Sequence, residues 1–126
     1  MRGHTQASVE RYLELAGKPL SSLQKPVATP CLDDHLLDPH DDVNPGKLKE
    51  ESAKIVFKAL YVARYNRVDI LWSVNALARE VTKWTVNCDK RLHRLMCYMH
   101  FTAHLEMQCW VGDPPEDLQL ALFADA

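Results

Sequence analysis

The chain has 126 residues, 47% of them hydrophobic and 25% charged, with a formal net charge of −2 at pH 7. This length fits one small domain or a piece of a larger one, and the composition excludes collagen-like, low-complexity and wholly disordered chains. Charge is unevenly spread: residues 45–104 carry eleven basic and five acidic side chains, whereas residues 105–126 carry five acidic and no basic ones. A basic block of this kind favours a polyanionic partner.

Nothing in the sequence indicates export or membrane insertion. Met1 is followed by polar residues rather than by the apolar core of a signal peptide. No window approaches the roughly 18 apolar residues that a membrane span needs. The four cysteines, Cys31, Cys88, Cys97 and Cys109, include no CxxC pair. We therefore expect an intracellular protein that is not secreted, keeps its thiols reduced and has no membrane partner.

The N-terminal part predicts a short helix followed by a long connector. An apolar stripe over residues 8–16 begins at Ser8, which can cap a helix, and ends before Gly17. Residues 18–44 hold four prolines and an acidic run, and an irregular stretch of this length is unusual inside a compact domain. We interpret residues 1–17 as a short N-terminal helix and the connector as lying over a larger body outside this chain.

Three helices are predicted in the region 45–104. The first starts at Asn44-Pro45, because Asn is a good cap and Pro suits the first helical position. The second covers residues 69–84, where apolar side chains recur at steps of three and four. The third covers residues 87–103 and begins at an Asn that can cap it.

After residue 104 the pattern changes from helix to strand. Apolar and polar residues alternate up to Val111, and Leu118, Leu120 and Leu122 alternate after a Gly-Asp-Pro-Pro turn signal. We therefore predict a β-hairpin over residues 105–126. The expected fold class is α+β, mainly α, with a three-helix core, a Pro-rich N-terminal connector and a C-terminal hairpin.

Motifs in the helical region resemble a known signature. Residues 59–70 read ALYVARYNRVDI, and residues 74–79 read VNALAR. These runs resemble the Leu-x-Tyr-x-Ala, Arg-Pro-Asp-Ile and Ala-Val-x-x-Leu-Ser-Arg motifs that follow the polymerase palm in Pol polyproteins of copia-type long-terminal-repeat retrotransposons. Residues 94–102, RLMCYMHFT, stand where that family has Arg-Ile-Leu-Arg-Tyr-Leu-Lys-Gly-Thr. Among the departures, Val68 replaces the family's Pro and Phe101 its Gly.

The resemblance covers residues 10–126 and implies a segment that runs from the thumb or connection of a reverse transcriptase into the start of ribonuclease H. The three helices would be thumb-like, and the hairpin would open the ribonuclease H sheet. Asp125 matches the first ribonuclease H carboxylate, whereas the other carboxylates would lie downstream, and the Tyr-x-Asp-Asp motif of the polymerase is absent. The isolated chain should therefore not be an enzyme, although its parent would copy RNA into DNA with Mg²⁺. Its first partner would be the remainder of the Pol polyprotein.

Basic side chains of the helical region are the candidate contacts to an RNA or DNA backbone, which are electrostatic and independent of sequence. The candidates are Lys54, Lys58, Arg64, Arg67, Arg91 and Arg94. The alternative hypothesis for the whole chain is a small helical module that binds nucleic acid or protein through the basic face of residues 45–104.

A row of histidine and cysteine side chains offers a different chemistry. His93, Cys97, His100 and His104 are spaced four, three and four residues apart, and such ligands suit zinc. Ligands along one straight helix climb away from each other, so a second segment would have to complete the site, and we expect neither zinc nor another cofactor in this chain. His93 and Cys97 could also form a nucleophile pair, but the sequence shows no third group that would orient the histidine.

Overall fold

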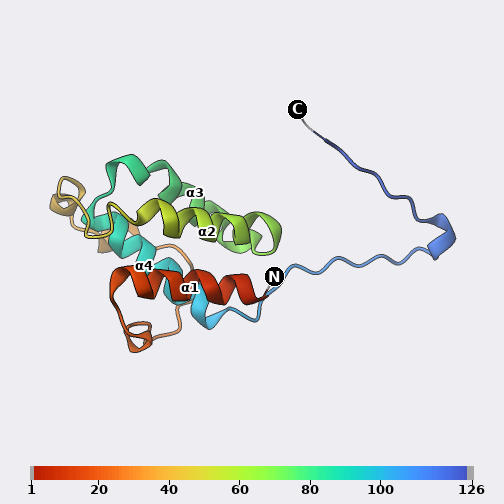
Figure 1. Cartoon of the computed structure of the whole chain (residues 1–126), viewed down its shortest axis with the longest axis horizontal. Coiled ribbons are helices and arrows are strands. Elements are labelled where there is room, and N and C mark those ends of the chain that lie inside the picture. Colours follow the sequence, from red (N-terminus) through yellow and green to blue (C-terminus); the bar gives the residue numbers. More distant parts are fainter. Residues whose placement is uncertain (1, 125–126) are drawn as a thin grey trace.

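Four α-helices make up the body of the chain over residues 2–124, the range that the computed structural model describes (Figure 1). The helices are α1 (Arg2–Ala16), α2 (Ser52–Tyr65), α3 (Leu71–Arg79) and α4 (Val86–Phe101). Five short 3-10 turns lie between the helices: η1 (Leu20–Ser22), η2 (Asp34–Leu36), η3 (Pro39–Asp42), η4 (Val68–Ile70) and η5 (Val81–Lys83). A sixth, η6 (Pro115–Asp117), follows α4.

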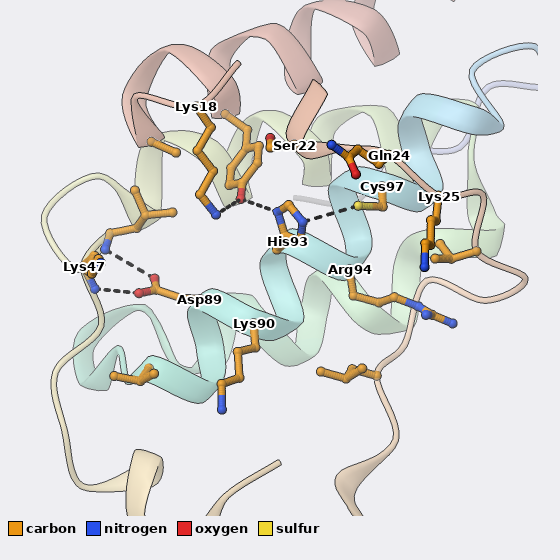
Figure 2. Close-up of a pocket in the computed structure, with 16 residues that line it drawn as sticks. Lys18, Ser22, Gln24, Lys25, Lys47, Asp89, Lys90, His93, Arg94 and Cys97 are labelled. Atoms are coloured by element: carbon orange, nitrogen blue, oxygen red, sulfur yellow. Dashed lines mark hydrogen bonds between the residues drawn. The ribbon is translucent and has the colours of Figure 1, made fainter. Parts of the chain in front are cut away.

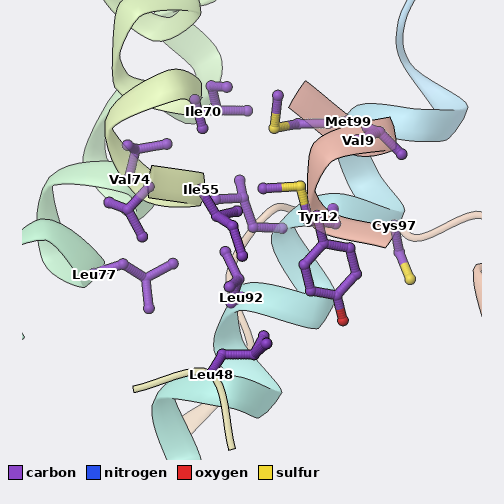
Figure 3. Close-up of a cluster of buried hydrophobic side chains, with 14 of the residues drawn as sticks. Val9, Tyr12, Leu48, Ile55, Ile70, Val74, Leu77, Leu92, Cys97 and Met99 are labelled. Atoms are coloured by element: carbon purple, nitrogen blue, oxygen red, sulfur yellow. The ribbon is translucent and has the colours of Figure 1, made fainter. Parts of the chain in front are cut away.

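The core lies where all four helices face each other (Figure 3). Ile55 from α2, Val74 from α3 and Leu92 from α4 are fully buried, because the apolar positions of each helix recur at helical spacing. Val9 and Tyr12 place α1 in the same cluster. The first helix is therefore a full member of the core, and it is longer than the predicted helix over residues 8–16.

The predicted C-terminal β-hairpin is wrong. Among residues 2–124 the structure has no β-strand, and the fold is all-helical rather than α+β. Residues 105–124 run away from the helical body as an extended, exposed segment (Figure 1). Alternating apolar residues form a stable strand only when one face is buried, and here Leu120 and Leu122 lie against nothing.

The first predicted helix begins later than its sequence signals indicate. Pro45 forms an antiparallel bridge with Thr85 instead of opening the helix, and α2 starts at Ser52. The carboxylate of Asp89 accepts hydrogen bonds from the backbone amides of Lys47, at 2.5 Å, and of the next residue, at 3.3 Å. A contact from a residue distant in sequence thus holds this segment as a turn.

The second and third predicted helices are present with different bounds. The stretch 69–84 is broken after Arg79, because Trp84 turns into the core and its indole N–H donates to Asp89 at 2.7 Å. The third helix is capped by the side chain of Thr85, which accepts from the Cys88 amide, and not by Asn87.

The acidic connector covers the helices of this same domain. Leu23 is buried, and the side chain of Asn87 donates to Asp38 and Asp42 of the connector at 2.8 and 2.7 Å. The thiol of Cys31 contacts the hydroxyl of Ser73 on α3 at 3.0 Å. The long irregular stretch is therefore ordered by α3 and α4, which supply hydrogen-bond partners for a chain that lacks regular structure.

No helix within residues 2–124 combines the length and the apolar character that crossing a bilayer needs.

Gly46 provides a test of the turn that precedes α2. A Cβ at Gly46 would lie 2.7 Å from Trp84 Cδ1 and 2.9 Å from Asp89 Oδ2, and closer still to the carbonyl oxygen of Thr85. We expect Gly46→Ala to lower the free energy of unfolding by about 1–3 kcal/mol in urea denaturation, since no neighbour can move freely. Gly3→Ala inside α1 is the control. A Cβ there has no neighbour within 4 Å, and the substitution should raise the free energy of unfolding by about 0.5–1 kcal/mol.

Candidate functional site

The structure joins residues of two sequence motifs in one polar cluster. Arg67 is 1% exposed, and its guanidinium pairs with both carboxylate oxygens of Asp69, at 2.9 and 2.8 Å. The same group donates to the carbonyl oxygen and the hydroxyl of Thr102, at 2.9 and 2.8 Å. The hydroxyl of Tyr98 donates to Asp69 at 3.0 Å. We call these four residues the Arg67 cluster; it ties the end of α2 and η4 to the end of α4.

Opposing effects act on the Asp69 carboxyl. Burial alone raises its pKa, but the hydrogen bonds and charge of Arg67 and the hydrogen bond from Tyr98 outweigh burial and lower the pKa below its usual 3.8. The carboxyl is therefore ionised at neutral pH, and the Arg67 guanidinium makes four hydrogen bonds inside the protein. Its predicted contact with nucleic acid would require this cluster to open.

Three of the predicted basic residues share the outer face of α2. The side chain of Lys54 is 58% exposed and pairs with Glu51 at 2.8 Å. Lys58 is half-buried and Arg64 is exposed. Neither of these two forms an ion pair within residues 2–124. This face therefore keeps net positive charge.

The basic residues of α4 lie against the acidic connector. Arg91 pairs with Asp34 at 3.0 Å, and Lys90 pairs with Asp41 at 2.6 Å. Arg94 donates to the carbonyl oxygen of Thr29 at 2.9 Å. Two acids of the connector, 49 and 57 residues away in sequence, thus neutralise Lys90 and Arg91, and Arg94 is held by a hydrogen bond to the same connector.

The carboxylates required for metal-dependent chemistry are not gathered in the part of the chain that the structure describes. Asp125, matched to the first ribonuclease H carboxylate, lies outside the described residues. Within residues 2–124 no three His, Cys, Asp or Glu side chains are placed so that they could hold a metal ion. His104, one of the four residues in the predicted row of ligands, follows the end of α4 and is exposed.

A pocket of about 690 Å³ lies between the end of α1, the start of the connector and α4 (Figure 2). On its wall Lys18 donates to the Tyr12 hydroxyl at 3.4 Å, and that hydroxyl is 2.8 Å from His93 Nδ1. His93 Nε2 lies 3.6 Å from Cys97 Sγ, which completes a chain of four polar side chains. The sequence singled out the His-Cys pair but not the two partners from α1 and the connector, which only the fold brings there.

The His93–Cys97 pair is not an activated nucleophile at neutral pH. Burial, and after it the charge of Lys18, lowers the pKa of His93 below its usual 6.5. Burial raises the pKa of the Cys97 thiol. Both groups are therefore neutral, whereas a reactive cysteine needs its thiolate form.

Comparisons with known proteins identify no relative. No family model, no curated protein and no solved structure matches the chain.

Replacing Arg67 tests the cluster. We expect Arg67→Met to lower the free energy of unfolding by about 3 kcal/mol, the lower end of the range for a broken buried ion pair, because Asp69 is one-third exposed. The matched control Arg64→Met removes an exposed arginine of α2 and should stay within about 0.5 kcal/mol. Equal effects in urea denaturation would contradict a stabilising role for the cluster.

The lowered pKa of Asp69 gives this cluster a pH signature. Its carboxylate stabilises the folded state above the unfolded pKa near 3.8, and this contribution is lost as pH falls through the lower folded value. The difference in unfolding free energy between the wild type and Arg67→Met should therefore shrink when urea titrations move from about pH 7 to about pH 3. A difference independent of pH would rule out the ionised pair as its source.

Proposed function

We propose that the chain is a helical segment of the Pol polyprotein of a copia-type long-terminal-repeat retrotransposon. In this proposal it completes neither the polymerase nor the ribonuclease H centre by itself. The parent protein would carry out RNA-directed DNA synthesis, and the remainder of the polyprotein would be the first partner of this segment.

The Arg67 cluster is the observation that supports this proposal. The resemblance rests on separate motifs, one containing Arg67 and Asp69 and the other containing Tyr98 and Thr102. In the fold three hydrogen bonds join the two motifs, although the residues that they connect are 29 to 35 positions apart in sequence. A chance match of loose motifs has no reason to bring their matched polar residues into a single contact.

The cluster also gives the motif residues a physical role. A guanidinium donates in a planar fork, and here one side of the fork meets a carboxylate while the other meets the last turn of a helix. Val68, which replaces the family's Pro, is 58% exposed beside this contact. The departure at this position therefore leaves the buried part of the motif intact.

The DNA on both sides of this reading frame provides the direct test. We expect a Tyr-x-Asp-Asp motif upstream and the remaining ribonuclease H carboxylates downstream, in the same frame. Flanking sequences that encode neither would contradict the proposal.

A second candidate function, binding of single-stranded nucleic acid, is favoured by the outer face of α2. Three aromatic side chains recur there at every fourth position: Phe57, Tyr61 and Tyr65 are 53%, 49% and 62% exposed. The rings of Tyr61 and Tyr65 lie 5.0 Å apart, and the ring of His4 from α1 lies 5.6 Å from Tyr61.

Cations accompany these rings on the same side of the helix. At about 100° per residue, the three aromatic side chains and the basic side chains Lys54, Lys58 and Arg64 fall within an arc of about 120°. The buried positions of α2 occupy the opposite side. Aromatic rings that can stack on bases, with cations beside them for phosphates, are the combination that sequence-tolerant single-strand binders use.

Aromatic substitutions test this face. We expect Tyr61→Ala and Tyr65→Ala each to weaken binding of a labelled single-stranded RNA by about 5-fold or more in fluorescence anisotropy, because each removes a stacking platform. Trp72→Ala on α3 is the control, since that ring is 69% exposed but lies on another helix.

Charge substitutions separate stacking from backbone contact. Lys58→Gln and Arg64→Gln should each reduce the slope of log affinity against log salt by about 1, whereas the tyrosine variants should leave that slope unchanged. The outer face of α2 is excluded as the binding surface if all four variants bind as tightly as the wild type.

A further inference from the structure

The pocket shown in Figure 2 combines apolar walls with a basic rim. Val27 and Leu32 of the connector, Leu48 and Val86 supply apolar lining. The volume of about 690 Å³ falls in the range of pockets that bind small molecules, so a few side chains of a peptide would also fit.

The charge of this rim is strongly one-sided. Its cations are Lys18, Lys25, Lys47, Lys90 and Arg94. Asp89 is the acidic lining residue, and its carboxylate already accepts from two backbone amides and the Trp84 indole. Among the described residues, no carboxylate pairs with the first three of these cations. The pocket is thus prepared for an occupant that is both acidic and apolar.

Residues 116–123 of the same chain have this chemistry. Glu116 and Asp117 open the segment. Leu120, Leu122 and Phe123 follow, each more than 90% exposed. Large apolar side chains that are exposed together are typical of an interaction surface.

We propose that the segment 116–123 of one copy occupies the basic pocket of a second copy, so that two chains exchange their C-terminal segments. The leucine side chains enter the apolar part of the pocket, and the two acidic residues face the lysines of the rim. The proposal rests on the pocket and the segment alone and does not depend on the resemblance to Pol polyproteins.

The direction of the segment favours a second copy over the chain's own pocket. Residues 105–124 leave the body on the side where α1 begins and lead away from it (Figure 1). The pocket lies at the other end of α1, beside Ala16 and Lys18. Reciprocal exchange between two copies also closes into a symmetric dimer, which leaves no pocket unfilled.

Sedimentation velocity of the full chain over a range of concentrations is the first experiment. We expect a monomer–dimer equilibrium, and the double variant Leu120→Asp, Leu122→Asp should raise its dissociation constant at least 10-fold. Val111→Asp is the control, because it introduces one aspartate at an exposed apolar position outside the segment. Circular dichroism of each variant checks that the helices are retained.

A charge exchange tests the pairing directly. The pocket variant Lys25→Glu, Lys47→Glu and the segment variant Glu116→Lys, Asp117→Lys should each be monomeric where the wild type dimerises. Their equimolar mixture should dimerise again, because each acidic partner then meets a basic one. Lys83→Glu, an exposed lysine outside the pocket, is the control for the pocket variant.

Three results would overturn the proposal. The wild type could remain monomeric at every concentration, whether or not its C-terminal segment binds to its own pocket. The dimer could persist unchanged in the leucine variant, which would assign it to another interface. The mixture of charge variants could stay monomeric although each folds.

Discussion

The buried guanidinium of Arg67 is the interaction on which the arrangement of the helices depends. A charged group at 1% exposure is costly to bury unless it is paired and hydrogen-bonded, and here the guanidinium makes four hydrogen bonds, to a carboxylate, a carbonyl oxygen and a hydroxyl. Because these partners come from η4 and from the end of α4, the cluster fixes how the end of α2 and η4 sit against the end of α4. The apolar faces supply the driving force for packing, and the cluster selects the register in which they pack.

The sequence predicts helices well where an apolar stripe is continuous and poorly where a distant residue competes for the backbone. The spacing over α4 marks that helix within a few residues of its bounds. The start of α2 could not be read in the same way, since Asn44-Pro45 is a good helix start in isolation. The carboxylate of Asp89, 42 residues from Lys47, accepts hydrogen bonds from the backbone amides that would lie in the first turn of such a helix. Local signals do not contain this tertiary contact.

The hairpin prediction failed for a related reason. Alternation over residues 118–122 describes a chain with two unlike faces, but it does not supply the surface against which one face is buried. The four-helix body offers no sheet for the segment to join within the described residues. The alternation of apolar and polar residues is therefore a property of the segment alone, whereas a stable strand also needs a neighbouring strand or surface to pair with.

The charged surfaces of the fold could not be predicted from the sequence, because a count of charges along the chain does not show which of them form ion pairs. Eleven basic residues between positions 45 and 104 suggest one extended basic face. The fold divides it instead: the connector places Asp34 and Asp41 on α4, the Arg67 cluster withdraws one arginine into the interior, and the outer face of α2 keeps its positive charge. The lysines around the pocket come from the connector, the turn before α2 and α4, so no single window of sequence contains them. The acidic connector neutralises basic side chains of α4. A polyanion or an acidic segment would therefore bind to the outer face of α2 or to the pocket rim, where lysines remain unpaired among the described residues. The net charge of −2 therefore says little about binding. The ion pairs within the fold decide which basic surfaces can attract an acidic partner.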